Sequence, residues 1–131
     1  MSESLLSFKT IIAVIGGFVA YFLGGWDVLL QTFCILVICD FITALISNGI
    51  NGKIDAKKCA EGIAKKVLYF VIIATAVAAN HLMPEIGLRE IVITFFIANE
   101  GISIIQNSSD FINLPPKFRQ FFESLGDADN E

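Results

Sequence analysis

Residues 28–47 read VLLQTFCILVICDFITALIS and contain one charged residue, Asp40. An α-helix rises 1.5 Å per residue, so a helix over this stretch would be about 30 Å long, which matches the hydrocarbon core of a bilayer. Three further stretches, residues 10–25, 67–83 and 91–106, are comparably apolar, and Glu100 is their only charge. The 131-residue chain is 55% hydrophobic and 17% charged, against roughly 45–50% and about 25% in soluble domains. The sequence predicts an all-α membrane protein and excludes a water-soluble enzyme.

Turn-forming residues divide the apolar stretches into four predicted spans. The first break is Gly24-Gly25-Trp26-Asp27, the second is residues 48–52, and the third is residues 83–87. Glycine, asparagine and proline favour turns over helix, so each break indicates a hairpin or a connection. The predicted transmembrane helices cover approximately residues 8–25, 28–47, 65–83 and 88–108.

Two amphipathic helices are expected outside the spans. Residues 55–64 carry lysines on one face and small apolar residues on the other, with Asp55 as the predicted N-cap. After Pro115 and Pro116, phenylalanines recur at helical spacing, which predicts a helix over residues 116–125 that lies in the membrane interface. We expect residues 1–125 to form one membrane domain and residues 126–131 an acidic disordered tail. The expected interfacial anchors are Trp26, Phe118, Phe121 and Phe122.

The cations predict the orientation of the chain. Loops rich in lysine and arginine stay in the cytoplasm, and with four spans eight of the nine cations fall on one side, leaving only Arg89 on the other. We therefore expect both termini and the central basic connector to be cytoplasmic. Besides Lys9, the residues on that side are Lys53, Lys57, Lys58, Lys65, Lys66, Lys117 and Arg119.

Asp40 and Glu100 are the two charges inside the predicted spans, and each lies twelve residues from the outer start of its span. They therefore sit at matching depth, about 18 Å below the outer interface. A carboxylate in hydrocarbon costs at least a few kcal/mol unless it is neutralised, paired or hydrated. Two interpretations stay open. Both carboxylates face a common polar seam or lumen, or both are structural, protonated or directed toward Lys65 and Lys66.

Polar residues form a stripe along one face of the last predicted span. Its residues recur at helical spacing opposite isoleucines, and a polar stripe cannot face lipid. It must face another span, another copy of the chain, or water. Because one short chain can bury only part of it, we expect a homo-oligomer. The candidate pore or interface residues on this helix are Asn99, Glu100, Ser103, Gln106 and Asn107, with Asp40 facing them from residues 28–47.

Signals for other chemistry are weak. His81 has no second ligand at metal-binding spacing, and three cysteines without CxxC spacing indicate buried apolar positions. We find no nucleophile–base pair, no phosphate-binding glycine loop and no nucleic-acid footprint. The sequence predicts no catalytic residue, no cofactor, no metal and no nucleic-acid partner.

Residues 95–107, FFIANEGISIIQN, followed by Leu114-Pro115-Pro116-Lys117, resemble the toxin-secretion/phage-lysis holin family. Asp40-Phe41-Ile42-Thr43 is similar to the family's Asp-x-x-Thr in span two, which adds Thr43 to the candidates. Gly62-Ile63-Ala64-Lys65-Lys66 is similar to its entry to the next span. The resemblance covers roughly residues 28–122, and it departs from the family where a glycine usually follows the threonine, at Ala44.

The resemblance implies a homo-oligomer in the bacterial cytoplasmic membrane that forms lesions or pores. A cytoplasmic endolysin or a large toxin would leave through them without necessarily touching the protein. Two alternatives stay open on the residues alone. One is a small four-span proton-coupled transporter or ion channel that uses Asp40 or Glu100, and the other is a non-conducting membrane scaffold.

Overall fold

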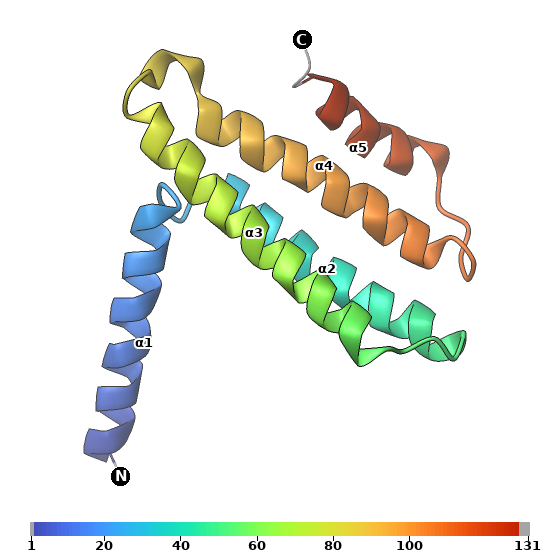
Figure 1. The fold of residues 1–131 in the computed structure, drawn as a ribbon, viewed down its shortest axis with the longest axis horizontal. Coiled ribbons are helices and arrows are strands. Elements are labelled where there is room, and N and C mark those ends of the chain that lie inside the picture. The colour runs from blue at the N-terminus through green and yellow to red at the C-terminus, as the bar shows by residue number, and fades with distance from the viewer. Residues whose placement is uncertain (1, 129–131) are drawn as a thin grey trace.

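The computed structural model describes residues 2–128. All the regular secondary structure of these residues is helical, which confirms the predicted all-α fold. Figure 1 shows the arrangement. The elements in order are α1 (Ser2–Phe22), α2 (Val28–Ile50), α3 (Ala56–Asn80), a 3₁₀ turn η1 (Pro84–Ile86), α4 (Leu88–Ser108) and α5 (Pro116–Ala128).

Three described helices, α1, α2 and α3, are long and apolar enough to span a membrane. The sequence predicted four, and by this criterion the prediction of residues 88–108 as a fourth span of the same kind is wrong. The reason is composition, because α4 carries Arg89, Glu90 and Glu100 as well as its polar stripe. The hydropathy of a helix reports contact with lipid, and α4 makes most of its contacts with protein.

α4 is the central helix of the fold. α2, α3 and α5 all pack against it, and α2 and α4 lie side by side along the bundle (Figure 1). Apolar side chains from α2, α3 and α4 meet in the core, where Leu30, Phe33, Ile73 and Ile93 are fully buried. More residues are buried on α4 than on any other described helix: Arg89, Ile93, Phe96, Ile97, Ala98, Glu100, Gly101 and Ile105.

α1 projects away from this bundle (Figure 1). None of its residues is buried. An apolar cavity of about 670 Å³ lies between its C-terminal end and α3, with Tyr21, Phe22, Ala74 and Ala78 in its lining. The bundle is therefore formed by α2 to α5, and α1 is attached through the loop that follows it.

The predicted connector helix over residues 55–64 is not a separate element. It is the first part of α3, which runs without interruption from Ala56 to Asn80. Nothing between Lys57 and Lys66 breaks a helix, since Gly62 is the only poor helix former in the segment. The basic segment and the apolar segment therefore belong to one continuous helix.

Side chains cap the N-termini of α3 and α4, and the cap of α3 is the one that the sequence predicted. Asp55 Oδ1 accepts a hydrogen bond from the Lys57 amide at 3.0 Å. Gly87 begins α4 in a left-handed conformation, with φ of 65°, and has no side chain to offer. Asn80 supplies the cap instead, because its Oδ1 accepts a hydrogen bond from the Leu88 amide at 2.9 Å.

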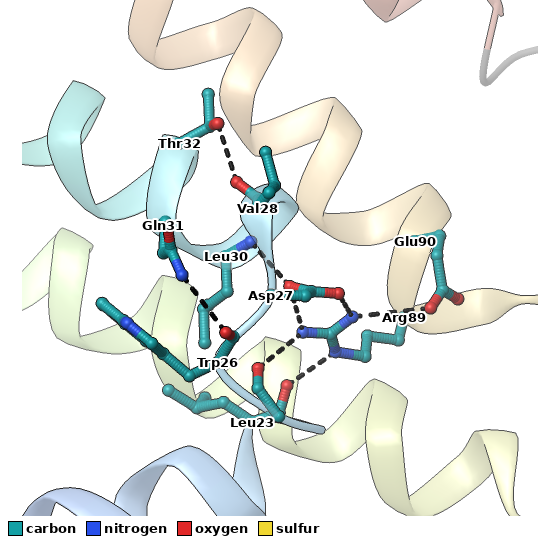
Figure 2. A network of polar contacts seen from close by, with 10 residues as sticks. Leu23, Trp26, Asp27, Val28, Leu30, Gln31, Thr32, Arg89 and Glu90 are labelled. Atoms are coloured by element: carbon teal, nitrogen blue, oxygen red, sulfur yellow. Dashed lines mark hydrogen bonds and ion pairs between the residues drawn. The ribbon is translucent and has the colours of Figure 1, made fainter.

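The loop between α1 and α2 is fastened to α4 by Arg89, which is only 5% exposed (Figure 2). Its guanidinium donates two hydrogen bonds to the Asp27 carboxylate, at 2.8 and 3.0 Å. It donates two more to the carbonyls of Leu23, at 2.6 Å, and Gly25, at 3.1 Å. Asp27 also caps α2 by accepting from the Leu30 amide at 3.0 Å. One carboxylate therefore begins α2 and holds the loop to α4.

We call these contacts of Arg89 with Asp27, Leu23 and Gly25 the Arg89 clamp, and they require a glycine at position 24. The residue has φ of 85°, and a Cβ there would collide with the Nε and Cδ of Arg89. Gly25 also has a positive φ, of 109°. Glycine alone adopts such angles at low cost, and these glycines allow the arginine to approach the backbone. The predicted break is a turn, but it does not form the expected tight hairpin, because α1 projects away from the bundle that contains α2 (Figure 1).

α5 folds back along α4 (Figure 1). Phe122 is buried against Gly101, where a Cβ would overlap the phenyl ring. Phe122 was expected to be an interfacial anchor, and the structure makes it a contact between helices, whereas Phe118 and Phe121 are exposed. α5 also extends past the predicted end at residue 125 to Ala128, and residues 129–131 of the predicted tail lie outside the described residues.

The clamp predicts a pH dependence. Hydrogen bonding and charge from Arg89 lower the pKa of Asp27 from 3.8 to about 2. The contribution of the carboxylate to stability is therefore complete above its unfolded pKa and is lost as the pH falls through about 2. In detergent, we expect the wild-type protein to melt at a higher temperature than Asp27→Asn. The difference between the two melting temperatures should be constant from pH 8 to 5 and should shrink below pH 4. Asparagine is a good N-cap, so the comparison isolates the clamp. A difference unchanged at pH 2 would contradict the assignment.

The contact between α5 and α4 predicts the effect of Gly101→Val. The new side chain displaces the Phe122 ring, so α5 should detach while α2, α3 and α4 stay packed. We expect faster proteolysis within residues 109–128 and a lower melting temperature, by several degrees. Gly17→Val is the control, because nothing lies within 4 Å of a Cβ at Gly17. Equal protease resistance in the two variants would show that this contact does not hold α5.

Candidate functional site

Three charged side chains from three helices meet inside the bundle. Lys66 Nζ of α3 lies 2.6 Å from Asp40 Oδ2 of α2 and 2.9 Å from Glu100 Oε2 of α4. The side chains of Lys66, Asp40 and Glu100 are 14%, 11% and 3% exposed. We call these residues the charge triad. One ammonium serves two carboxylates, so each helix supplies a charge that the others need.

Two further polar side chains extend the triad. Asn107 donates to Asp40 Oδ1 at 2.9 Å and to Thr43 Oγ1 at 3.1 Å. The Thr43 hydroxyl in turn donates to the Cys39 carbonyl of its own helix at 2.9 Å. α2 and α4 are therefore joined by hydrogen bonds as well as through Lys66, and the remaining Asp40 oxygen has its own donor.

This geometry bears on the two interpretations of Asp40 and Glu100. The carboxylates do lie together at one depth of the bundle, and they are paired with Lys66. Lys65, the other lysine considered, instead has its ammonium 5.7 Å from the centre of the Tyr69 ring. Buried charges are tolerated when they are paired and hydrogen-bonded. The triad therefore joins three helices through ion pairs, and whether it also borders a lumen stays a prediction.

The remaining stripe residues line an open groove on the surface formed by α3 and α4. The groove has a volume of about 320 Å³ and borders the triad through Glu100. Asn99 and Gln106 are exposed, and within the described chain no hydrogen bond satisfies either side chain. We call this surface the polar groove. Its lining residues are Lys65, Tyr69, Asn99, Glu100, Ile102, Ser103 and Gln106.

The predicted stripe is thus divided in two. Glu100 and Asn107 are satisfied inside the chain, and Asn99 and Gln106 remain open to whatever surrounds the helix. The expectation that one chain can bury only part of the stripe matches this division. Whether the open part contacts a second copy or lines a lumen stays a prediction.

Two important residues carried little weight in the sequence reasoning. Arg89 was counted only for topology, yet it pairs with Asp27 in the loop before α2. Lys66 was named beside Lys65 as a possible partner of the two carboxylates, and it is the lysine that pairs with both. A signal existed for both. Lys66 directly precedes a charge-free stretch, which places it near hydrocarbon. Arg89 is the only cation on the predicted outer side of the membrane, where Asp27 is also expected.

The other basic residues are exposed, as a topological role requires. Lys53, Lys57 and Lys58 lie on the surface around the start of α3. On α5, Lys117 is exposed and Arg119 lies 3.5 Å from Glu123. Trp26 is also exposed, in the loop before α2. Their roles in orientation and anchoring stay predictions.

One comparison with known proteins identifies a family, and a second finds uncharacterized relatives. The profile of the bacteriophage holin family matches residues 17–127. An uncharacterized protein of Halalkalibacterium halodurans is 30% identical over 94% of this chain and 95% of its own length. Uncharacterized proteins of Clostridium perfringens and Listeria monocytogenes are 26% and 29% identical, over 99% and 84% of this chain and 98% and 77% of their own lengths. No solved structure matches the chain.

The triad predicts a large difference between adjacent lysines. Lys66→Met leaves two carboxylates facing each other without a cation, and breaking a buried pair costs about 3–5 kcal/mol. Lys65→Met removes an exposed charge and should cost less than about 1 kcal/mol. The measurement is the free energy of unfolding in mixed micelles as the fraction of denaturing detergent rises. Similar losses for the two variants would contradict a structural triad.

Proposed function

This chain belongs to the bacteriophage holin family, and we propose that it oligomerises in the bacterial cytoplasmic membrane and permeabilises it. The proposal assigns it a non-enzymatic role. The lesions would release a cytoplasmic endolysin, or a large toxin in an exporting relative. The supporting observation is the polar groove, an unsatisfied polar surface between α4 and α3, in a chain with three helices that are apolar enough to span a membrane.

The proposed topology follows from helix packing and charge. α1, α2 and α3 are long and apolar enough to cross the membrane. In this proposal α4, which does not meet that criterion by itself, returns across the membrane because it packs along α2 and α3. The basic side then carries both termini and the loop between α2 and α3. In this arrangement the polar groove lies at membrane depth, where neither Asn99 nor Gln106 can remain against lipid.

A second copy of the chain satisfies the groove best. Amides hydrogen-bond across helices in bilayers, at about 1–2 kcal/mol for each contact in model peptides. Paired grooves would hide these amides while subunits accumulate. Rearrangement of the same subunits into a ring would turn the amides toward water, so one surface serves both the closed assembly and the open lesion.

The position of α5 also supports an assembly in which water lies beside α4 and α5. Its outer surface carries Arg119 and Glu123, and its inner surface rests on Gly101, about 20 Å along α4. Charged residues at that depth require water or protein beside them. An assembly that encloses water next to α4 and α5 meets this requirement, and a single subunit surrounded by lipid does not.

The groove predicts the behaviour of the double variant Asn99→Leu/Gln106→Leu. We expect insertion into lipid vesicles to be unchanged and release of a trapped muralytic enzyme to fall by about tenfold or more, since roughly 1.4 kcal/mol of subunit contact is lost. The matched control is Thr32→Leu/Thr75→Leu, which adds leucines where each hydroxyl bonds only to its own helix.

Three outcomes would contradict the proposal. Unchanged enzyme release from the groove variant would exclude the groove as the assembly surface. Saturable passage of small solutes without enzyme release would favour a transporter or channel. Vesicles that remain sealed to both, with the protein inserted, would favour a scaffold.

A further inference from the structure

A second polar cavity opens between α2 and the first half of α3. Its volume is about 200 Å³. α2 and α3 both pack on α4, and they meet each other through side chains, among them Asp40 with Lys66 and Phe33 with Phe70. It extends from the loop after α2, near Asn48 and Asp55, to the charge triad. We call it the α2–α3 cleft.

The α3 wall of the cleft is basic and has a gap at its centre. Lys58 and Lys65 both line it. They are seven residues apart, hence on one face of the helix and about 10 Å apart along its axis. Gly62 lies between them, and nothing is found within 4 Å of the position that its Cβ would take. An anion above Gly62 would therefore have a lysine on either side.

The α2 wall is apolar in its middle, where Phe41, Ala44 and Leu45 line the cleft between Asp40 and Asn48. The cleft thus joins a cationic wall to an apolar wall. A free inorganic anion uses only the first. A molecule with a phosphate and a hydrocarbon chain uses both.

The carboxylates that face the cleft are already engaged. Asp40 is paired with Lys66 and accepts a hydrogen bond from Asn107. Asp55 accepts the amide of Lys57 as the cap of α3. Lys58 has no ion pair within the described residues, and Lys65 has only its contact with Tyr69. The Lys58 ammonium is therefore available to an anion, and the Lys65 ammonium joins it by leaving Tyr69, which lines the polar groove and not the cleft.

The depth of the cleft suits a lipid headgroup. α3 has no charged residue between Val67 and Asn80. Lys58 lies about 33 Å from Asn80 along the helix, slightly more than the hydrocarbon thickness of about 30 Å. Lys58 therefore reaches the phosphate layer. Lys65, one to two turns deeper, can extend its side chain back toward that layer.

We propose that the α2–α3 cleft binds an anionic phospholipid, with its phosphate between Lys58 and Lys65 and its acyl chain against Phe41 and Leu45. The bound lipid fills the space that helix packing leaves open between α2 and α3. Binding requires only an inserted, folded subunit. The proposal therefore stands or falls separately from permeabilisation.

The test is native mass spectrometry of the full chain, delipidated in detergent and then supplied with phosphatidylglycerol or phosphatidylcholine. We expect one retained phosphatidylglycerol per chain and much less phosphatidylcholine. Lys58→Ala/Lys65→Ala should weaken phosphatidylglycerol binding by about thirtyfold. Lys53→Ala/Lys57→Ala removes the same charge from outside the cleft and should change binding by less than about threefold.

A second variant tests the cavity without changing charge. Gly62→Leu fills the cleft and favours helix, so it should fold and still lose the retained lipid. Equal weakening by the two lysine pairs would overturn the proposal in favour of a general charge effect. Unchanged retention in Gly62→Leu would also overturn it. Displacement of the lipid by millimolar inorganic phosphate would assign the cleft to free phosphate.

Discussion

The ion pairing of Lys66 with Asp40 and Glu100 is the interaction on which the bundle depends. Each charge alone would cost several kcal/mol in an apolar bundle, so α2, α3 and α4 are stable together only in the register that brings the three groups within hydrogen-bond distance. A shift of one helix by a single turn would move its charge about 5 Å and leave the others uncompensated. Apolar packing around Phe33 and Ile73 supplies contact area, and the triad selects one arrangement among the many that apolar surfaces permit.

α4 occupies the centre because it carries partners for both ends of the bundle. Near its start Arg89 holds the loop between α1 and α2, and eleven residues later Glu100 joins the triad. Two further polar residues, Asn99 and Gln106, are exposed in the polar groove that α4 forms with α3. The same helix is thus fixed on its inner faces and unsatisfied on its outer face. A protein that must be stable as a subunit and still associate with copies of itself needs such a division.

Much of this architecture could be predicted from the sequence, and the failures have physical causes. Apolar length located α2 and the later part of α3, and turn residues located the breaks, because both are local properties. Hydropathy failed for α4, since a helix sheltered by protein can be more polar than one that contacts lipid. The closeness of Asp40 and Glu100 was expected from their equal depth. Which lysine pairs with them, Lys66 or Lys65, depends on which face of α3 meets α4. That choice is a property of tertiary packing. The contact between Phe122 and Gly101 was missed for the same reason, because an amphipathic helix near a membrane can rest on lipid or on protein.

The detachment of α1 has a consequence for how such a protein can diverge. A helix with no buried residue is constrained only to remain apolar and helical, so most of its side chains can be exchanged for others of similar hydropathy without loss of fit. The charge triad and the Arg89 clamp allow no such exchange, since each member requires a specific partner on another helix. Two kinds of substitution pattern should therefore coexist in one short gene, a freely drifting first helix and a bundle whose polar residues change only in concert.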